Sequence, residues 1–286
     1  MTMTTTPTTP LVRTHISLEN DGDTVTAPES PPSAWATATT YAGRTVRQFI
    51  RTPQLLVVSA VTSVMFLLIF RYVFGGAIQT GPVRYVDFLI PALAAVSGLF
   101  SGGVVGVAED ADSGLFDRLK SLPVPRAAIL LGRSMADTGL IMWGTVVTVV
   151  VGFVVGFRFH GGVVGALAAL GLCVLFAAAF SWLGIFLGLS AGSSQAAQGL
   201  SFAVFPLIFV SSAYVPVQSM PSWLRPIADN QPVTAMVGAV RALVLGGDTA
   251  TLLGHSTTWF ITRSLSWSVI IMIVFATLST RRFTKR

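Results

Sequence analysis

The sequence predicts an all-α polytopic membrane protein with six transmembrane helices, and three observations support this fold class. Of the 286 residues, 52% are hydrophobic and 10% are charged, whereas a soluble domain carries about 25% charged residues. The mean hydropathy is +0.73. Apolar runs long enough to cross a bilayer as helices recur along the chain. The net charge of +6 does not indicate nucleic-acid binding, because the basic residues lie in loops beside the apolar runs and not in one patch.

The N-terminal part of the chain divides into two segments. Residues 1–34 are rich in Thr, Pro and Ser and predict a disordered cytoplasmic tail, which leaves 35–286 as the transmembrane domain. The stretch "AWATATTYAGRTVRQFIRTPQ" sets apolar side chains against three arginines, which predicts an amphipathic helix on the inner membrane surface. A solvated soluble helix is the alternative. The apolar set is Tyr41, Val46, Phe49 and Ile50, and the basic set is Arg44, Arg47 and Arg51.

Six membrane spans are expected in the remaining sequence. They lie near 54–74, 86–107, 137–157, 163–189, 199–217 and 258–279. An even number of spans places both termini on one side, and if that side is the cytoplasm it holds twelve of the 18 Lys and Arg residues. This distribution satisfies the positive-inside rule, so both termini are predicted to be cytoplasmic.

Small residues and one proline within the spans predict local features of the helices. Gly184, Gly188 and Gly192 are four residues apart, which allows close helix contact either within the subunit or at a dimer seam. Pro206 deprives the Phe202 carbonyl of its helical donor and predicts a kink in the fifth span.

The spans do not carry a recognisable catalytic or nucleotide-binding motif. Arg133 and Asp137 are four residues apart at the cytoplasmic end of the third span and resemble an interfacial ion pair more than a proton relay. There is no zinc-ligand pattern, no Ser–His pair within the spans and no Gly-rich lysine motif for phosphates. The chain itself is therefore not expected to be an enzyme, nor to bind a cofactor or metal.

The loop "EDADSGLFDRLKSLPVPR" carries seven of the chain's charged residues between two apolar runs. Asp112 or Ser113 is predicted to cap a short helix. Its apolar face would carry Leu115, Phe116, Leu119 and Leu122. Such a face could anchor a soluble partner, while an ordinary solvated loop with orientation charges is an equal alternative.

The segment "VPVQSMPSWLRPIADNQPVTAMVGAVRALVLGG" lies between the fifth and sixth spans. Its apolar part, "PVTAMVGAVRALVL", is too short to cross a bilayer, and prolines divide the rest. Two short helices that dip into the outer leaflet and return would fit this pattern. We expect this re-entrant hairpin to form either an external gate or a plain surface lid, and the gate residues would be Val215, Pro216, Met220, Pro221 and Trp223.

The order of these elements resembles the permease subunit of type-2 ABC exporters, in particular the daunorubicin-resistance subgroup. The similarity rests on "RTPQLLVVSAVTSVMFLLIFRYVFG", "YVDFLIPALAAVSGLFSGG", "EDADSGLFDRLKSLPVPRAAILLGRSMAD" and the outer segment, and it spans about residues 36 to 285. It implies a bacterial plasma-membrane dimer of permease subunits with two ATPase subunits, which would bind ATP and Mg. It also implies that residues from Asp112 to Leu122, including Gly114 and Arg118, form the coupling helix, and that Arg44 and Arg47 lie against the same ATPase.

Aromatic residues on the first, second and fifth spans are candidates for the transport path. They are Phe66, Phe70, Phe100, Phe202, Phe205 and Phe209. An apolar path suits a lipophilic drug or lipid moving among membrane lipids, in agreement with the subgroup that the sequence resembles. Export of a lipid-linked glycan and a non-transporting membrane scaffold remain alternatives.

Overall fold

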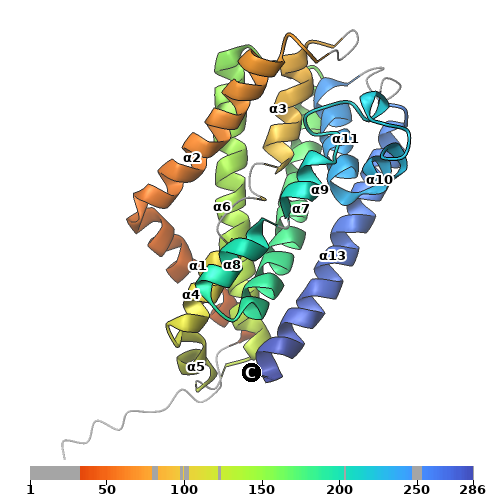
Figure 1. The fold of residues 1–286 in the computed structure, drawn as a ribbon. Coiled ribbons are helices and arrows are strands. Elements are labelled where there is room, and N and C mark those ends of the chain that lie inside the picture. The colour runs from red at the N-terminus through yellow and green to blue at the C-terminus, as the bar shows by residue number, and fades with distance from the viewer. Residues whose placement is uncertain are drawn as a thin grey trace, which may run out of the picture. The chain divides into compact units, whose positions relative to one another are not determined.

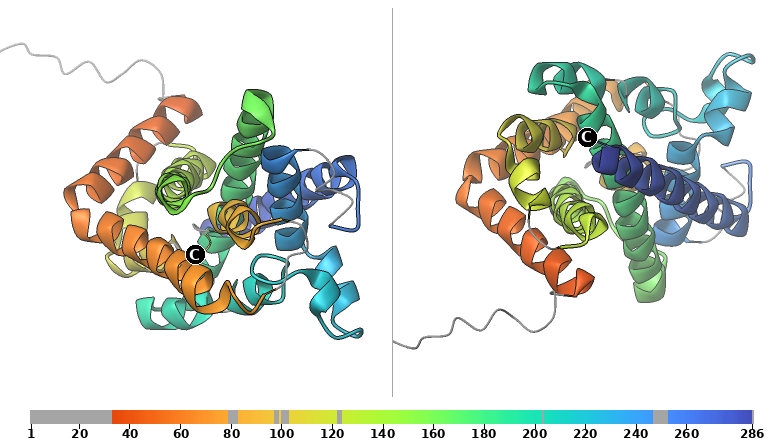
Figure 2. Two further views of the ribbon diagram at one scale, coloured as in Figure 1. Left: turned by 90° about the horizontal axis from the view of Figure 1, so that it is seen from above. Right: turned by 90° about the horizontal axis from the view of Figure 1, so that it is seen from below.

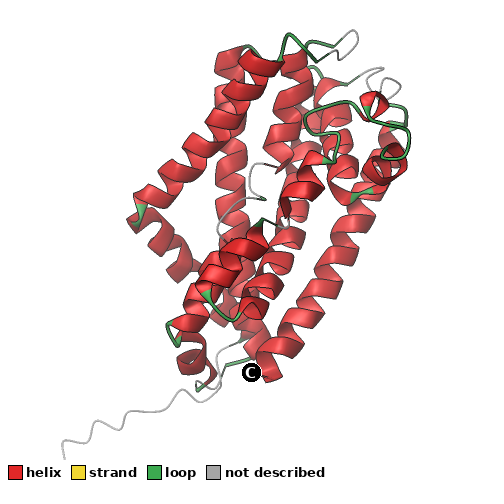
Figure 3. Ribbon diagram, viewed as in Figure 1, coloured by secondary structure: helices red, strands yellow, loops and turns green. Residues whose placement is uncertain are grey.

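The computed structural model describes residues 33–78, 83–96, 99, 103–121, 124–202, 204–246 and 253–285. These residues form helices joined by turns, with no strand among them (Figure 3). The tail predicted for residues 1–34 lies outside the described residues, apart from Ser33 and Ala34. Ser33 caps the first helix by accepting a hydrogen bond from the Ala36 N–H.

Among the described residues, four helices are long and apolar enough to cross a membrane. One is the second helix of the chain together with its π-helical continuation, and the other three are 29 or 30 residues long. Their bounds are α2 (Pro53–Leu68) with η1 (Ile69–Phe74), α6 (Arg126–Val155), α7 (Gly162–Ala191) and α13 (Thr257–Lys285). These correspond to the first, third, fourth and sixth spans predicted from the sequence.

The second and fifth predicted spans are each divided in two. The run 86–107 contains α3 (Tyr85–Val96) and the start of α4 (Gly103–Asp112), and between them only Leu99 is described. The run 199–217 contains the end of α8 (Ser194–Ser201) and α9 (Val204–Phe209), followed by turns. None of these four helices alone reaches the length of about 20 residues that a crossing needs. The four long helices are established by this structure, and the six-span count stays a prediction.

Pro206 has the predicted effect on the Phe202 carbonyl. The Phe202 carbonyl cannot receive the usual helical bond because Pro206 has no N–H. It accepts instead from the Phe205 N–H at 3.1 Å, a tighter turn that coincides with the interruption between α8 and α9.

α7 is the most connected helix of the bundle. It contacts α4, α6, α8, α11 and α13, and α6 in turn contacts α1 (Ala34–Arg51) and α2. The two end-on views of Figure 2 show α6 and α7 in the middle, with α1 and α2 on one side and α13 on the other. The predicted amphipathic helix is α1, and its buried stripe of Ala38, Tyr41, Ala42 and Thr45 lies against α6.

The two ends of the bundle carry different elements (Figure 1). The short helix α5 (Leu115–Lys120) and the C-terminal end of α13 lie at one end, which we call the α5 end. The other end carries η2 (Val217–Ser219), α10 (Arg225–Asn230) and α11 (Pro232–Leu245). The apolar run "PVTAMVGAVRALVL" is α11, with the bounds predicted, and it is almost wholly buried against α3, α7 and α13.

One of the predicted glycine contacts forms within the subunit. A Cβ added at Gly188 of α7 would lie 2.6 Å from the Val104 carbonyl oxygen and 2.7 Å from the Val107 Cβ, both on α4. The absence of a side chain at Gly188 therefore lets α4 and α7 approach closely. Gly192 has a φ of 75° and ends α7 in the left-handed conformation.

Candidate functional site

The predicted coupling helix exists as α5, but its apolar face is turned inward. Gly114, with a φ of 69°, makes the left-handed turn that separates α4 from α5. The Phe116 side chain is only 4% exposed and packs edge-to-face on Phe283 of α13, with 5.2 Å between ring centroids. The structure therefore corrects the interpretation of Phe116 as a surface anchor, because its ring holds α5 to the bundle.

The outer surface of α5 is polar. Asp117 and Arg118 are exposed, whereas Leu115 and Leu119 are half-buried. Leu122, the last predicted anchor, lies outside the described residues. A partner that binds this surface would therefore contact the charged side chains of Asp117 and Arg118.

The capping prediction for this segment is wrong. The residue that caps α5 is Gly114, without a side-chain bond, and the Ser113 hydroxyl donates to the Asp110 carbonyl at 3.0 Å. Asp112 bonds to a different helix: one carboxylate oxygen accepts from the Ser194 N–H at 3.0 Å and from the Ser194 hydroxyl at 2.6 Å. Asp112 thus joins the end of α4 to the first residue of α8.

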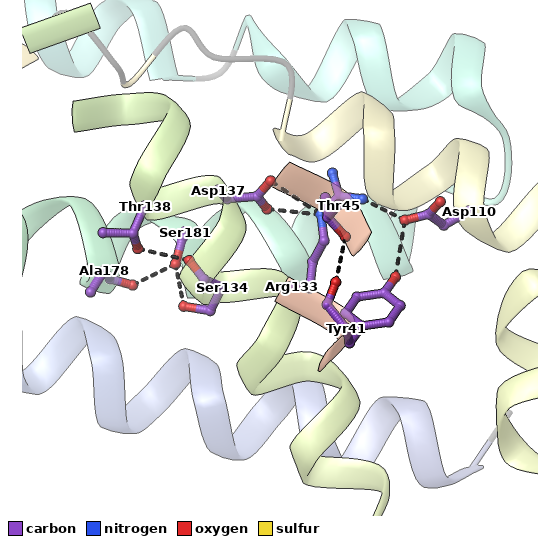
Figure 4. A network of polar contacts seen from close by, with 9 residues as sticks. All are labelled: Tyr41, Thr45, Asp110, Arg133, Ser134, Asp137, Thr138, Ala178 and Ser181. Atoms are coloured by element: carbon purple, nitrogen blue, oxygen red, sulfur yellow. Dashed lines mark hydrogen bonds and ion pairs between the residues drawn. The ribbon is translucent and has the colours of Figure 1, made fainter. Parts of the chain in front are cut away.

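Four polar side chains from three helices meet near the α5 end in a charge network (Figure 4). It consists of Tyr41 on α1, Asp110 on α4, and Arg133 and Asp137 on α6. The Arg133 Nε lies 3.1 Å from each carboxylate oxygen of Asp137, and its Nη1 donates to Asp110. The Tyr41 hydroxyl donates to the same Asp110 oxygen at 3.4 Å. Burial, followed by the Asp110 carboxylate, raises the pKa of the Tyr41 phenol from 10.0 to about 12.

The ion pair is more deeply buried than the sequence suggested. The Arg133 and Asp137 side chains are 5% and 3% exposed, so this pair does not lie at a water interface. Two glycines of α4 make room for it: a Cβ at Gly106 would lie 2.5 Å from an Arg133 terminal nitrogen, and one at Gly103 would lie 3.4 Å from Asp137. Asp110 and Tyr41 were not predicted as partners, because their sequence distance from Arg133 gives no local signal.

The residues of α1 that are predicted to contact the ATPase lie on its exposed side, away from α6. Arg44 and Arg47 are exposed, whereas the stripe that contains Tyr41 is buried against α6. The bond between Tyr41 and Asp110 places α1 beside the end of α4. α1, the end of α4 and α5 therefore lie near one another at the α5 end (Figure 1).

Five of the six predicted path residues form one continuous aromatic row, which also includes Tyr214. The ring-centroid distances are 5.3 Å from Phe202 to Phe205, 6.1 Å from Phe205 to Phe209, and 5.2 Å from Phe209 to Tyr214. Tyr214 stacks on Phe70 at 4.1 Å. Phe70 continues the row on the first span to Phe66 at 6.4 Å and Phe74 at 5.3 Å. Phe100 lies outside the described residues.

The aromatic row runs from the end of α8 through α9 to η1 and α2, and several of its rings are exposed. Phe202 is 64% exposed and Phe209 is 48% exposed. Tyr214, by contrast, is buried, and the sequence analysis did not identify it as part of this surface. It lies in a turn within the predicted fifth span, 199–217, and its contact with Phe70 joins two distant segments, which the pattern of one span does not reveal.

The predicted gate residues are divided between core and surface. Met220 is buried with Val217 and Ala228, Val215 and Pro216 are half-buried, and Pro221 and Trp223 are exposed. These residues lie in the turns and short helices that precede α11.

The turn that precedes the gate residues is held by Arg241 of α11, whose role was not predicted. Its guanidinium donates to the backbone carbonyls of Phe88, Ser212 and Ala213 at 2.7, 2.8 and 2.9 Å. It also lies 3.4 Å from the centre of the Phe88 ring. Arg241 thereby fixes the backbone directly before Tyr214.

Comparisons with known proteins identify the family of the chain. The family model of the ABC-2 type transporter matches residues 38–245. A daunorubicin resistance ABC transporter permease protein of Streptomyces coeruleorubidus is 29% identical over 267 residues, covering 92% of each chain. A doxorubicin resistance ABC transporter permease protein of Mycobacterium tuberculosis is 28% identical and covers 71% of this chain and 70% of its own. A probable doxorubicin resistance permease of the same organism is 26% identical, with 65% and 69% covered.

Because the family model covers more than half of the chain, from α1 to the end of α11, the protein belongs to the ABC-2 type transporter family.

Proposed function

We propose that this chain is the permease subunit of an ATP-driven exporter that moves a lipophilic drug or lipid out of the cytoplasm or the inner leaflet. Two kinds of observation support the proposal. The similar proteins are drug-resistance permeases by name, and one of them matches over 92% of its length. The described part of the chain also carries a partly exposed row of aromatic rings along α9 and the helix formed by α2 and η1.

The aromatic row is the single observation that carries the substrate class. Flat rings offer large apolar contact areas and stack on other rings. Exposed rings at Phe202 and Phe209 must be covered by lipid, by a second subunit or by a ligand. In a dimer with a second permease subunit, two such rows would face a shared path in which a lipophilic, partly aromatic compound could be held without polar contacts.

The ATPase would bind at the α5 end. This assignment places both termini of the chain in the cytoplasm, together with the exposed Arg44 and Arg47 of α1 and the charged surface of α5. The complementary charges would orient the partner during docking. ATP and Mg would be bound by that partner, and this chain would respond to its movement.

The opposite end would act as the outer gate. Arg241 fixes the turn before Tyr214, and Tyr214 closes the aromatic row against Phe70. The segment from Val215 to Trp223 continues directly from this turn. Movement of the turn would therefore separate Tyr214 from Phe70 and displace the gate residues at the same time.

Inside-out membrane vesicles that contain the chain and the ATPase subunit that co-purifies with it provide the test. We expect ATP to drive accumulation of daunorubicin in these vesicles, and a non-hydrolysable ATP analogue to abolish it. A membrane scaffold predicts no ATP-dependent accumulation of any compound. Export of a lipid-linked glycan predicts that a polyprenyl-linked oligosaccharide stimulates ATP turnover while daunorubicin does not, and that result would replace the proposed substrate.

A further inference from the structure

The last turn of α4 carries two carboxylates that bind helices on opposite sides. Asp110 and Asp112 are two residues apart, which places their side chains about 200° apart around the helix axis. Asp110 binds Arg133 of α6 and Tyr41 of α1. Asp112 binds Ser194, the first residue of α8.

The contact between Asp112 and Ser194 has the chemistry of a helix cap supplied from outside the helix. α8 already has its own cap, because the Ser193 hydroxyl accepts from the Ala196 N–H at 3.2 Å. The Asp112 carboxylate adds a second acceptor for the first N–H of the helix. A negative charge at this position also favours the dipole of the helix. Asp112 therefore stabilises the position of α8 relative to α4.

Apolar packing extends the same contact along the two helices. Val104 and Ala108 of α4 form a small buried cluster with Ala197 of α8, and Ala197 is fully buried. α8 ends at Ser201, directly before Phe202, the first ring of the aromatic row. The eight residues of α8 span about 12 Å, so a rigid α8 connects Asp112 to the row over one short helix.

We propose that Asp112 is a positioning residue that makes the end of α4 and α8 move as one body, so that movement of α5 at the ATPase reaches the aromatic row. This inference rests on the proposed function and adds the route by which the ATPase controls the substrate row. It assigns Asp112 to a contact within the permease and not to a contact with the ATPase. Asp110 would transmit the same movement to α6 and α1.

The first test separates these two roles of Asp112 in the reconstituted permease–ATPase complex. We expect Asp112→Ala to lower the ratio of daunorubicin-stimulated to unstimulated ATP turnover about fivefold, the effect of losing one helix cap. The amount of ATPase that co-purifies should stay unchanged. Asp112→Asn, which keeps an acceptor oxygen, should restore most of the ratio. Glu109→Gln removes a charge from the same helix at an exposed position and serves as the matched control.

A disulfide provides the second and stricter test. Asp112→Cys and Ser194→Cys are combined in a Cys173→Ala background, so that these are the only two thiols. We expect the reduced protein to be uncoupled like Asp112→Ala, and the oxidised protein to regain daunorubicin-stimulated turnover, because the covalent bond replaces the lost cap. Merely structural damage would not be reversed by oxidation.

The outcomes distinguish this inference from the proposed function. If the unmodified complex shows no stimulation by daunorubicin, the proposed function fails. If it is stimulated but Asp112→Ala behaves like Glu109→Gln, or if the disulfide stops turnover, then α4 and α8 do not move as one body and the inference is wrong. Loss of ATPase binding in Asp112→Ala would assign Asp112 to the partner surface instead.

Discussion

The charge network around Arg133 can be tested by removing its arginine. Arg133→Met leaves the Asp137 carboxylate, 3% exposed, without its two bonds to the guanidinium. Removal of one partner from a buried ion pair costs about 3 to 5 kcal/mol of folding free energy, because the other charge stays buried and unpaired. Asp110 should contribute less to the loss, since its side chain is 18% exposed and it keeps the Tyr41 hydroxyl.

The double variant Arg133→Met/Asp137→Leu removes both charges and isolates this effect. Replacement of a buried ion pair by apolar side chains is often neutral or stabilising. We therefore expect the double variant to be more stable than Arg133→Met alone, although it carries one more substitution. This inverted order is the signature of an unpaired charge.

Thermal unfolding of the purified chain in detergent micelles measures the difference. At about 2 to 4 °C per kcal/mol, Arg133→Met should lower the midpoint by about 6 to 20 °C, and the double variant should recover more than half of this loss. Arg118→Met on the exposed face of α5 is the control, with an expected shift below about 2 °C. Equal losses in the single and double variants would refute the reasoning and would point to packing of the arginine stem.

Three further predictions concern packing, the path and pH. Gly188→Val should lower the free energy of unfolding by about 1 to 3 kcal/mol through its clash with α4. Gly171→Val on the same helix, where an added Cβ meets nothing within 4 Å, should not. Equal thermal unfolding midpoints of the two variants would exclude the close contact. Phe209→Ala should raise the KM for daunorubicin transport about two- to tenfold, and Phe153→Ala on α6 should not. Because the pKa of Tyr41 is raised from 10.0 to about 12, its neutral form contributes stability that is complete below pH 10 and is lost as the pH rises toward 12. Tyr41→Phe should remove that part of the loss, as unfolding midpoints measured from pH 9 to pH 12 would show.

The patterns that sequence reasoning interpreted well are local ones. The composition identified the membrane protein, and the bounds of α11 followed from an apolar run between a proline and a glycine. The loss of the usual helical bond to the Phe202 carbonyl followed from the missing N–H of Pro206. In each case the cause and its effect lie within a few residues of each other.

The sequence was less informative where tertiary contacts decide. The apolar run 86–107 indicates one continuous span, whereas the structure describes α3 up to Val96 and α4 from Gly103, and hydropathy alone does not show where a helix is interrupted. The amphipathic pattern of α5 showed which side of the helix is apolar, but not that Phe283 of its own chain covers Phe116. Asp112 has the right position to cap α5, yet its carboxylate accepts hydrogen bonds from Ser194, 82 residues later.

The central claim is that a lipophilic substrate binds along the aromatic row. A single cysteine at Phe202 in a Cys173→Ala background tests it most directly, because this ring is 64% exposed and is only one of several in the row. The rate of its labelling by a maleimide is measured in the permease–ATPase complex with and without daunorubicin. Val154→Cys, at an 84% exposed position on α6, is the control. The account predicts that daunorubicin slows labelling at 202 and not at 154, whereas unchanged rates at both positions in a complex that transports the drug would contradict it.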